Sequence, residues 1–377
     1  MIYLDNGATS FPKPRGMVAA MEECILKYCG NPGRSGHFMS MKTGEKVYHA
    51  RRAVAELFNI SAAEGSFHEN TTEALNMGLH GFLENGDHVI TTSMEHNSVL
   101  RPLKAMEKEG ISHSIVKGNK RGEINPQDIE RAIKSNTSLI VVTAASNVTG
   151  TKMPLKEMGG IARKNGIAFM VDGAQGAGTM NLNVEELNID MLALPGHKGL
   201  LGPLGTGALY VSPYIKLSRR SKGEQVRSQS RVQPEEFPEG FESGTINAPA
   251  IIGLGYSAGF IKKIGLDVIG DYEEELIACL DERLMNMDFI SLYGPEPSKK
   301  TGISLINIDG MGAEEVTSVL NSKYGIAVRG GYHCAGLAHK TVGTWGTGGV
   351  RISVGPFNSK KDIERLTDAL WEIGRNR

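Results

Sequence analysis

One lysine and one aspartate of this sequence occupy positions from which they could do chemistry together. Asp172 directly follows the apolar run 167–171, and Lys198 comes shortly after a second such run at 190–194. Short runs of this kind are typical of buried strands, and ligands of open α/β sheets bind beyond the carboxyl ends of the strands. An amine forms imines with carbonyl compounds, and a carboxylate can keep a ring nitrogen protonated. The two residues therefore predict imine chemistry at one edge of a sheet.

Pyridoxal 5'-phosphate is a cofactor that needs both of these groups from its protein. Taken alone, an aspartate after a strand is usually a cap and a lysine is usually solvated, but placement on neighbouring strand ends favours cofactor binding. The phosphate end can also be placed. Asn70 is expected to be a helix N-cap, with Glu73 as its capping-box partner. Thr71 and Thr72 would then offer hydroxyls and amides where the helix dipole attracts an anion.

Two further side chains could act beside such a cofactor. His96 follows the strand-like run 89–92, and its ring could stack on a pyridine ring, although a lone histidine is more often structural. Cys334 lies in the glycine-bearing loop 329–336, where an arginine and a histidine could stabilise an exposed thiolate. The other cysteines lie in helix-like stretches and are expected to be buried as small apolar residues: Cys24, Cys29 and Cys279. A zinc site of His333, Cys334 and His339 is not expected, because no second ligand pair at finger-like spacing accompanies them.

The composition limits the partners of the chain. Its 377 residues include 41 lysines and arginines against 42 aspartates and glutamates, so no net field favours nucleic acid or an anionic membrane. Four scattered cysteines are too few for a disulfide framework, and reduced thiols are expected. No run approaches the ~20 apolar residues of a membrane span, and no signal-like segment opens the chain. These features predict a cytoplasmic protein with a small-molecule substrate.

Strand-like and helix-like segments alternate from about residue 65 to residue 211, which predicts a parallel sheet covered by helices. The expected strands there are 88–92, 112–116, 138–143, 167–171, 190–194 and 207–211, and the expected helices are 98–109, 126–135 and 155–165. Beyond Pro249, the expected elements are a long helix to about 288, strands 303–308, 326–328 and 350–353, helix 313–323 and a final helix from Ser359. We therefore expect an α/β fold with a large domain at 21–248, a small α+β domain at 249–377, and residues 1–20 packing beside the small domain. The segment 213–243 is expected to extend towards a partner subunit or the rim of the site.

Taken together, the motifs resemble the class-V aminotransferase family, and most of all its group II cysteine desulfurases and selenocysteine lyases. The segments that carry the resemblance cover nearly the whole chain: 3–9, 31–37, 71–74, 95–97, 146–151, 172–175, 197–198, 241–245 and the surroundings of Cys334 and Arg351. The resemblance implies a fold-type I pyridoxal-phosphate-dependent transferase, with a mainly parallel sheet in a large domain plus a small α+β domain. It also implies a homodimer whose active sites are shared between the subunits.

The resemblance implies roles for individual residues. Lys198 would form the imine with the cofactor and shuttle protons, Asp172 would pair with the ring nitrogen, and Cys334 would attack the substrate sulfur. The other cofactor-binding residues would be His96 on the ring, Gln175 at the phenolic oxygen, Asn147, the phosphate ligands Thr71, Thr72 and His197, and Thr245 from the other subunit. The substrate would be bound by Asn147 and Arg351, which hold its carboxylate, and by His37 in a role left open.

Some positions depart from the family pattern. Pro195 stands where relatives commonly have a serine, and proline offers the phosphate neither a hydroxyl nor an amide. Tyr332 replaces a frequent histidine, and the segment 222–225 lacks a common double glycine. None of these changes removes the central chemistry, so the resemblance implies conversion of L-cysteine to L-alanine, with a persulfide on Cys334 and a protein sulfur acceptor. Lysis of L-selenocysteine and pyridoxal-phosphate-dependent C–S β-elimination remain open alternatives, whereas the intact catalytic set argues against a sulfur-relay scaffold without catalysis.

Overall fold

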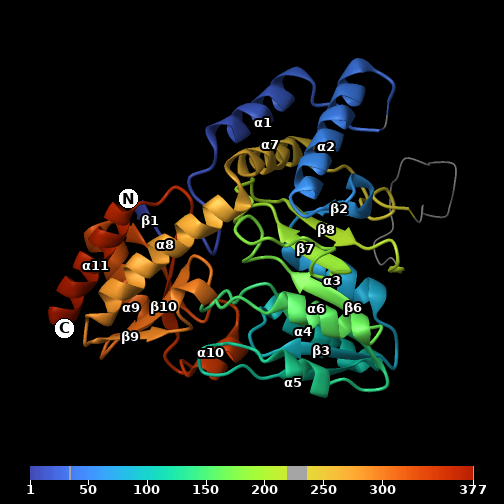
Figure 1. Cartoon of the computed structure of the whole chain (residues 1–377). Coiled ribbons are helices and arrows are strands. Elements are labelled where there is room, and N and C mark those ends of the chain that lie inside the picture. Colours follow the sequence, from blue (N-terminus) through green and yellow to red (C-terminus); the bar gives the residue numbers. More distant parts are fainter. Residues whose placement is uncertain (34, 219–235, 377) are drawn as a thin grey trace.

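The computed structural model describes residues 1–33, 35–218 and 236–376 and arranges most of them around two sheets (Figure 1). The larger sheet has seven strands in the order β2-β8-β7-β6-β5-β3-β4. Their bounds are Gly65–His68 (β2), His88–Thr92 (β3), Ser112–Val116 (β4), Thr137–Thr143 (β5), Ala168–Asp172 (β6), Met191–Pro195 (β7) and Gly207–Val211 (β8). Strands β3 to β7 run parallel, and β8 runs antiparallel to both of its neighbours. The predicted mainly parallel sheet is confirmed.

The two faces of the larger sheet bury two different apolar clusters, because successive side chains of a strand point to opposite faces. In β5, Val141 belongs to one cluster and Val142 to the other. The helices that cover the faces include α3 (Thr71–Phe82) and α4 (Asn97–Met106) over the cluster of Val141, and α6 (Leu155–Lys164) over that of Val142. Burial of both faces explains why these strands are near-continuous apolar runs.

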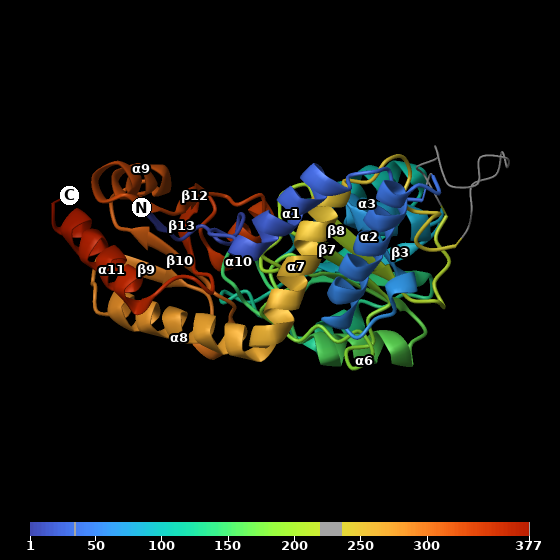
Figure 2. The same cartoon turned by 90° about the horizontal axis from the view of Figure 1, so that it is seen from above.

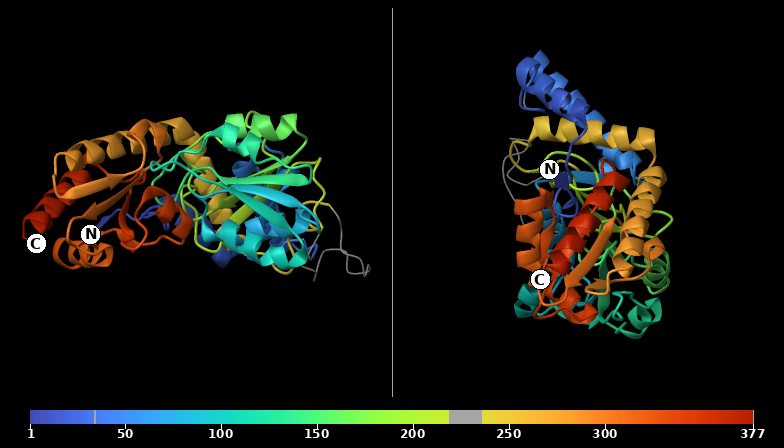
Figure 3. Two further views of the ribbon diagram at one scale, coloured as in Figure 1. Left: turned by 90° about the horizontal axis from the view of Figure 1, so that it is seen from below. Right: turned by 90° about the vertical axis from the view of Figure 1, so that its left-hand side faces the viewer.

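The smaller sheet has four antiparallel strands in the order β12-β13-β10-β9. Their bounds are Ile290–Tyr293 (β9), Ile303–Ile308 (β10), Arg329–Gly331 (β12) and Gly349–Ser353 (β13). A separate apolar cluster lies between this sheet and the helices α8 (Leu266–Met285), α9 (Ala313–Tyr324) and α11 (Lys360–Arg375). Figure 2 shows this part beside the larger sheet, and Figure 3 shows both chain termini on its side of the molecule.

The amino-terminal residues join the smaller part, while the next helices join the larger one. Strand β1 (Ile2–Tyr3) pairs in parallel with β11 (Ile326–Ala327). The helices α1 (Arg15–Lys27) and α2 (Phe38–Glu56) contact α7 (Ala248–Ile264), whose apolar residues belong to a cluster of the larger sheet. The domain boundaries at residues 20 and 248 stay predictions. Gly265 is an alternative boundary, because α7 ends there and the backbone of Gly265, with a φ of +102°, turns the chain into α8.

Most expected elements occur close to their predicted bounds, but two predicted helices were wrong. The long helix to about 288 is two helices, because Gly265 breaks it. The helix 126–135 is shorter, α5 (Pro126–Arg131), and the amide of Lys134 donates to Thr137 Oγ1 at 2.8 Å instead of continuing it. The sequence did not predict the strands β1, β2, β9 and β12 or the helices α2 and α10 (Gly336–Val342). Much of 213–243, including 222–225, lies outside the described residues. Among the described helices, none is long and apolar enough to cross a membrane.

Candidate active site

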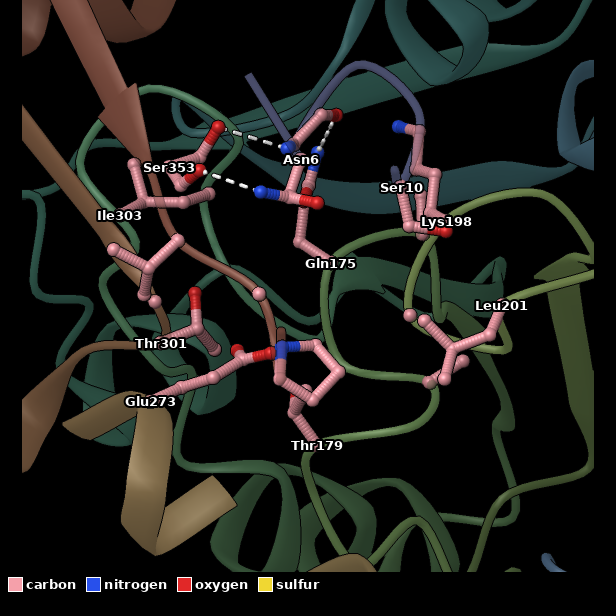
Figure 4. Close-up of a pocket in the computed structure, with 18 residues that line it drawn as sticks. Asn6, Ser10, Gln175, Thr179, Lys198, Leu201, Glu273, Thr301, Ile303 and Ser353 are labelled. Atoms are coloured by element: carbon pink, nitrogen blue, oxygen red, sulfur yellow. Dashed lines mark hydrogen bonds between the residues drawn. The ribbon is translucent and has the colours of Figure 1, made fainter. Parts of the chain in front are cut away.

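The residues predicted to form the imine and to protonate the ring gather at the carboxyl ends of β6 and β7. Asp172 is the last residue of β6 and pairs with Ala193 of β7 in parallel register. Lys198 follows the end of β7 after a two-residue connection. Their expected placement on neighbouring strand ends is confirmed. Figure 4 shows Lys198 at the wall of a cavity that Gln175 and Ser10 also line.

Burial and mutual charge set the protonation of this pair. Burial lowers the pKa of Lys198 to about 8; the negative charge of Asp172 opposes that shift, and the positive charge of Arg351 adds to it. Burial raises the pKa of Asp172, against the amide of Ala174, which donates to Oδ1 at 2.9 Å, and the charge of Lys198. A lysine with this pKa carries a neutral, nucleophilic amine in a useful fraction of molecules near neutral pH.

Only one of the two predicted capping hydrogen bonds is present at the first turn of α3. Asn70 Oδ1 accepts a hydrogen bond from the Glu73 amide at 2.9 Å. The predicted return bond of the capping box is wrong, because the Glu73 carboxylate accepts from the amide of Glu69 at 2.7 Å. Thr71 is buried and Thr72 is exposed. Because they are the first two residues of α3, both threonines lie at the positive end of the helix dipole, where an anion is favoured.

Ser98 connects this turn to His96, and the sequence reading missed it. Its hydroxyl lies 2.8 Å from Thr72 Oγ1 and 2.8 Å from His96 Nδ1. His96 Nδ1 also accepts from the Ser98 amide at 3.1 Å and so caps α4. Burial, and then the charge of Lys198, lower the pKa of His96 to about 4, so the ring is neutral at pH 7. A hydroxyl two residues after a candidate N-cap histidine is the signal that could have identified Ser98.

A second cavity, of about 570 Å³, is lined by His197, Asn70 and Thr245. His197 Nδ1 is buried without a hydrogen-bond partner among the described residues. Burial, and then the charge of Lys198, lower the pKa of His197 to about 4. Thr245 is exposed, and its Oγ1 accepts from Asn31 Nδ2 at 3.3 Å. Within one chain the structure thus brings two of the four predicted phosphate ligands, His197 and Thr245, to the same cavity, beside the helix cap Asn70; Thr71 and Thr72 are not among the residues that line it.

Arg351 and Asn147 meet at the other end of the site. The Arg351 side chain is 1% exposed; its Nη2 lies 2.7 Å from Asp5 Oδ1, and its Nη1 donates to the Asn147 carbonyl at 3.0 Å. Burial lowers the pKa of Arg351, and the charge of Asp5 opposes this. In the described structure, Arg351 Nε and Asn147 Oδ1 are buried without partners. One donor and one acceptor of this contacting pair are therefore left open. Asp5 was missed as a partner of Arg351, because 346 residues separate the two in sequence.

Cys334 is exposed in a turn with two consecutive left-handed residues, His333 at φ +52° and Cys334 at φ +57°. Arg329 Nη2 lies 3.9 Å from the sulfur. The ring of His333 is buried, and its nitrogens contact the Arg329 carbonyl at 3.1 Å and His339 Nε2 at 3.2 Å. Of the two groups predicted to stabilise a thiolate, Arg329 is the one placed to do so, because both nitrogens of His333 are engaged elsewhere.

The remaining predictions concern His37 and the burial of the other three cysteines. His37 is exposed and caps α2, where its Nδ1 accepts from the Ser40 amide at 3.3 Å; the structure does not show it joined to that group. Burial of the remaining cysteines holds for Cys24, is partial for Cys279 and is wrong for Cys29. Cys29 is exposed because α1 has already ended at Lys27.

The fold and this arrangement define a fold-type I transferase of the kind that uses pyridoxal phosphate. The family model described as Aminotransferase class-V matches residues 2–366, so the chain belongs to that family. A "Probable cysteine desulfurase" of Methanothermobacter thermautotrophicus is 36% identical over 99% of this chain and 94% of its own length. A "Cysteine desulfurase" of Salmonella agona is 31% identical over 100% of this chain and 94% of its own. The apo structure of a cysteine desulfurase from Thermococcus onnurineus NA1 is 34% identical, with a TM-score of 0.94 over 100% of this chain and 95% of that one.

Proposed function

We propose that the protein is a pyridoxal-phosphate-dependent cysteine desulfurase that converts L-cysteine to L-alanine and receives the sulfur on Cys334. The observation that carries the proposal is the attachment of the Cys334 turn to the predicted site. The carbonyl of Cys334 accepts from the Asn97 amide at 2.9 Å, and the carbonyl of His333 accepts from Asn147 Nδ2 at 2.6 Å. An exposed thiol is thereby held against loops that leave the carboxyl ends of the larger sheet.

Pyridoxal phosphate fits the groups that these loops present. Asp172 is a buried carboxylate able to pair with a ring nitrogen, Lys198 is an amine with a lowered pKa, and His197 Nδ1 is an orphaned polar atom that a phosphate would satisfy. The other assigned contacts are His96, Gln175, Thr71, Thr72, Asn147 and Thr245, the last from a second subunit. When bound, the cofactor supplies an electron sink for the α-carbon of an amino acid.

We assign the substrate carboxylate to Arg351 and to the second N–H of Asn147 Nδ2, whose first N–H is donated to the His333 carbonyl. The buried Nε of Arg351 lacks an acceptor among the described residues, and a buried charged donor without a partner is costly. A carboxylate would satisfy it, and a planar guanidinium binds carboxylates with better defined geometry than an ammonium does. The open Oδ1 of Asn147 would accept from a donor of the bound amino acid.

Sulfur transfer would begin at the Cys334 thiolate, next to the positive charge of Arg329. An S–S bond forms as the C–S bond of the substrate breaks, and the electron pair of the broken bond leaves with the carbon. A proton delivered by Lys198 to that carbon completes L-alanine. The balance is one L-cysteine plus one Cys334 thiol giving one L-alanine plus one Cys334 persulfide.

The test is to incubate the purified protein with L-cysteine and measure alanine, pyruvate and protein-bound persulfide. Alanine without pyruvate, and persulfide on Cys334, are expected; pyruvate as the main product would show β-elimination instead. Cys334→Ala should abolish alanine formation from L-cysteine, whereas Cys29→Ala, which removes another exposed thiol, should not. Alanine formed at the wild-type rate by Cys334→Ala would refute the persulfide step. Running L-selenocysteine in parallel measures the preferred chalcogen.

We also propose a homodimer with shared sites and a cytoplasmic location, which the free state of all four cysteines supports. Apolar side chains stand exposed on α1 and α2, which favours a second copy of the chain as their cover: Val18, Ile25, Leu26, Phe38, Met39, Met41 and Tyr48. Leu26→Glu together with Phe38→Glu should shift sedimentation towards the monomer, and an unchanged dimer would place the interface elsewhere. A protein acceptor for the persulfide is proposed on the exposure of Cys334.

A further inference from the structure

The carbonyl oxygen of His197, in the peptide bond that precedes Lys198, lies within hydrogen-bond distance of four donors. Lys13 Nζ is 2.7 Å away, and Thr9 Oγ1 is 2.9 Å away. The amide of Ser10 lies at 3.0 Å and its hydroxyl at 3.2 Å. A carbonyl oxygen has two lone pairs, so this acceptor is more than fully used. All four donors come from one short stretch of the amino-terminal segment.

Lys13 is the charged member of this group. Its ammonium donates to the His197 carbonyl and, at 2.7 Å, to Ser10 Oγ. Burial lowers the pKa of Lys13 to about 8. Withdrawing a charge from water is costly unless polar groups compensate, and an ionised donor makes the stronger class of hydrogen bond. The position of Lys13 is therefore tied to this carbonyl.

The same segment contacts two other groups of the site. Its Gly7 carbonyl accepts from Gln175 Nε2 at 3.0 Å, and its Asp5 carboxylate pairs with Arg351. The amide of Gly7 donates to Ser353 Oγ at 2.8 Å, so the segment is also fixed to the smaller sheet. Figure 4 draws the hydrogen bonds at Ser353 and Gln175, with Ser10 and Lys198 lining the same cavity.

We propose that Lys13 is a positioning residue for Lys198, holding the His197 carbonyl so that the lysine amine meets the cofactor in one orientation. Lys13 touches neither substrate nor cofactor in this scheme, and it acts through the backbone of the loop after β7. This inference rests on the proposed function, because it takes Lys198 as the amine that links to the cofactor.

The experiment compares wild type with Lys13→Met, which keeps the apolar stem and removes the donor. In one measurement, pyridoxal phosphate is added to protein stripped of cofactor, and the linkage at Lys198 is trapped with borohydride. Because a charge-assisted hydrogen bond is lost, this linkage should form about tenfold more slowly in the variant. In the holoprotein, the pH midpoint of the bound-cofactor absorbance should rise by roughly half a unit, because a nearby positive charge is gone. Lys13→Arg, which restores a charged donor, should return both values towards wild type.

The matched control is Lys152→Met. Lys152 Nζ also donates to a backbone carbonyl, that of Ser298 at 3.3 Å, but this carbonyl lies on another loop. It should leave linkage rate and absorbance midpoint unchanged. If Lys13→Met does not fold, Thr9→Val removes another donor to the same carbonyl and should slow formation of the linkage in the same way. Wild-type values in the folded Lys13 or Thr9 variant overturn the inference. A wild-type protein with no linkage at Lys198 overturns the proposed function instead.

Discussion

Arg351→Lys keeps a positive charge on β13 but removes the planar fork of the guanidinium. In the wild type that fork serves Asp5 through Nη2 and the Asn147 carbonyl through Nη1, and it leaves Nε for a carboxylate. An ammonium is a compact point charge, so it cannot bind Asp5, a carbonyl and the substrate in the same plane. We expect the introduced lysine to keep an ion pair with Asp5 and to lose the contact with the substrate.

The magnitude follows from the contacts that disappear. Hydrogen bonds to charged groups contribute about 1.5–3 kcal/mol each, and one such bond to the substrate is lost. At 1.4 kcal/mol per factor of ten, kcat/KM for L-cysteine should fall about 10- to 100-fold. Arg351→Met goes further, because it strands the Asp5 carboxylate without its partner, and it should also lower the folding stability by about 3 kcal/mol.

The assay is alanine formation at varied L-cysteine, together with binding of L-alanine followed by the absorbance of the bound cofactor. Both should weaken in Arg351→Lys, while its thermal unfolding stays close to wild type. Equal kcat/KM and equal L-alanine binding in a folded Arg351→Lys variant would refute the assignment, and the carboxylate would then have to bind at another cation, for which Arg329 is the candidate because its charge acts on Arg351.

Three further outcomes are expected. Lys198→Ala should abolish the borohydride-reducible linkage, and mass spectrometry that maps this linkage to another lysine of the wild type would contradict the assignment. Asp172→Asn should retain cofactor but lose most turnover, because the ring nitrogen loses its charged partner, and unchanged turnover would leave Asp172 as a mere cap. Burial raises the pKa of Glu273 to about 8 in the folded protein from 4.5, so the folded state binds its proton more tightly and stability should fall as pH rises from about 4.5 to about 8. Glu273→Gln should therefore be more stable than wild type at pH 8, by up to about 4 kcal/mol, and equal to it near pH 4.5; denaturant unfolding at both pH values checks the difference.

The sequence predicted the elements whose signals are local. Strand β6 and the cap Asn70 could be predicted because a buried parallel strand is a continuous apolar run and a cap lies within one turn of its target. The break at Gly265 was missed although the sequence carries a signal for it, because two lysines in the last turn followed by a glycine are typical of a helix end. In the structure the positive φ of Gly265 marks the break. Short edge elements such as β12 carry two glycines in three residues and have no strand-like pattern.

The candidate site could be predicted where residue type and position after a local strand-like run together indicate the chemistry, as for Lys198 and Asp172. It could not be predicted where tertiary contacts decide the outcome. The orientation of His333 away from the thiol depends on His339 and on the Arg329 carbonyl. The use of Asp5 and Lys13 depends on the amino-terminal segment lying across the site, which no local pattern indicates.

The pairing of Asp5 with Arg351 has a consequence for how the protein is made. Because 346 residues separate the two partners, Arg351 meets the Asp5 carboxylate only after almost the entire chain has left the ribosome. Contacts of such long range bring a large loop-closure cost and slow folding. The larger sheet, built from residues 65–211, can form earlier during synthesis. A partly synthesised chain would then carry Lys198 and Asp172 on a finished sheet edge while it still lacks Arg351, the residue to which we assign the substrate carboxylate.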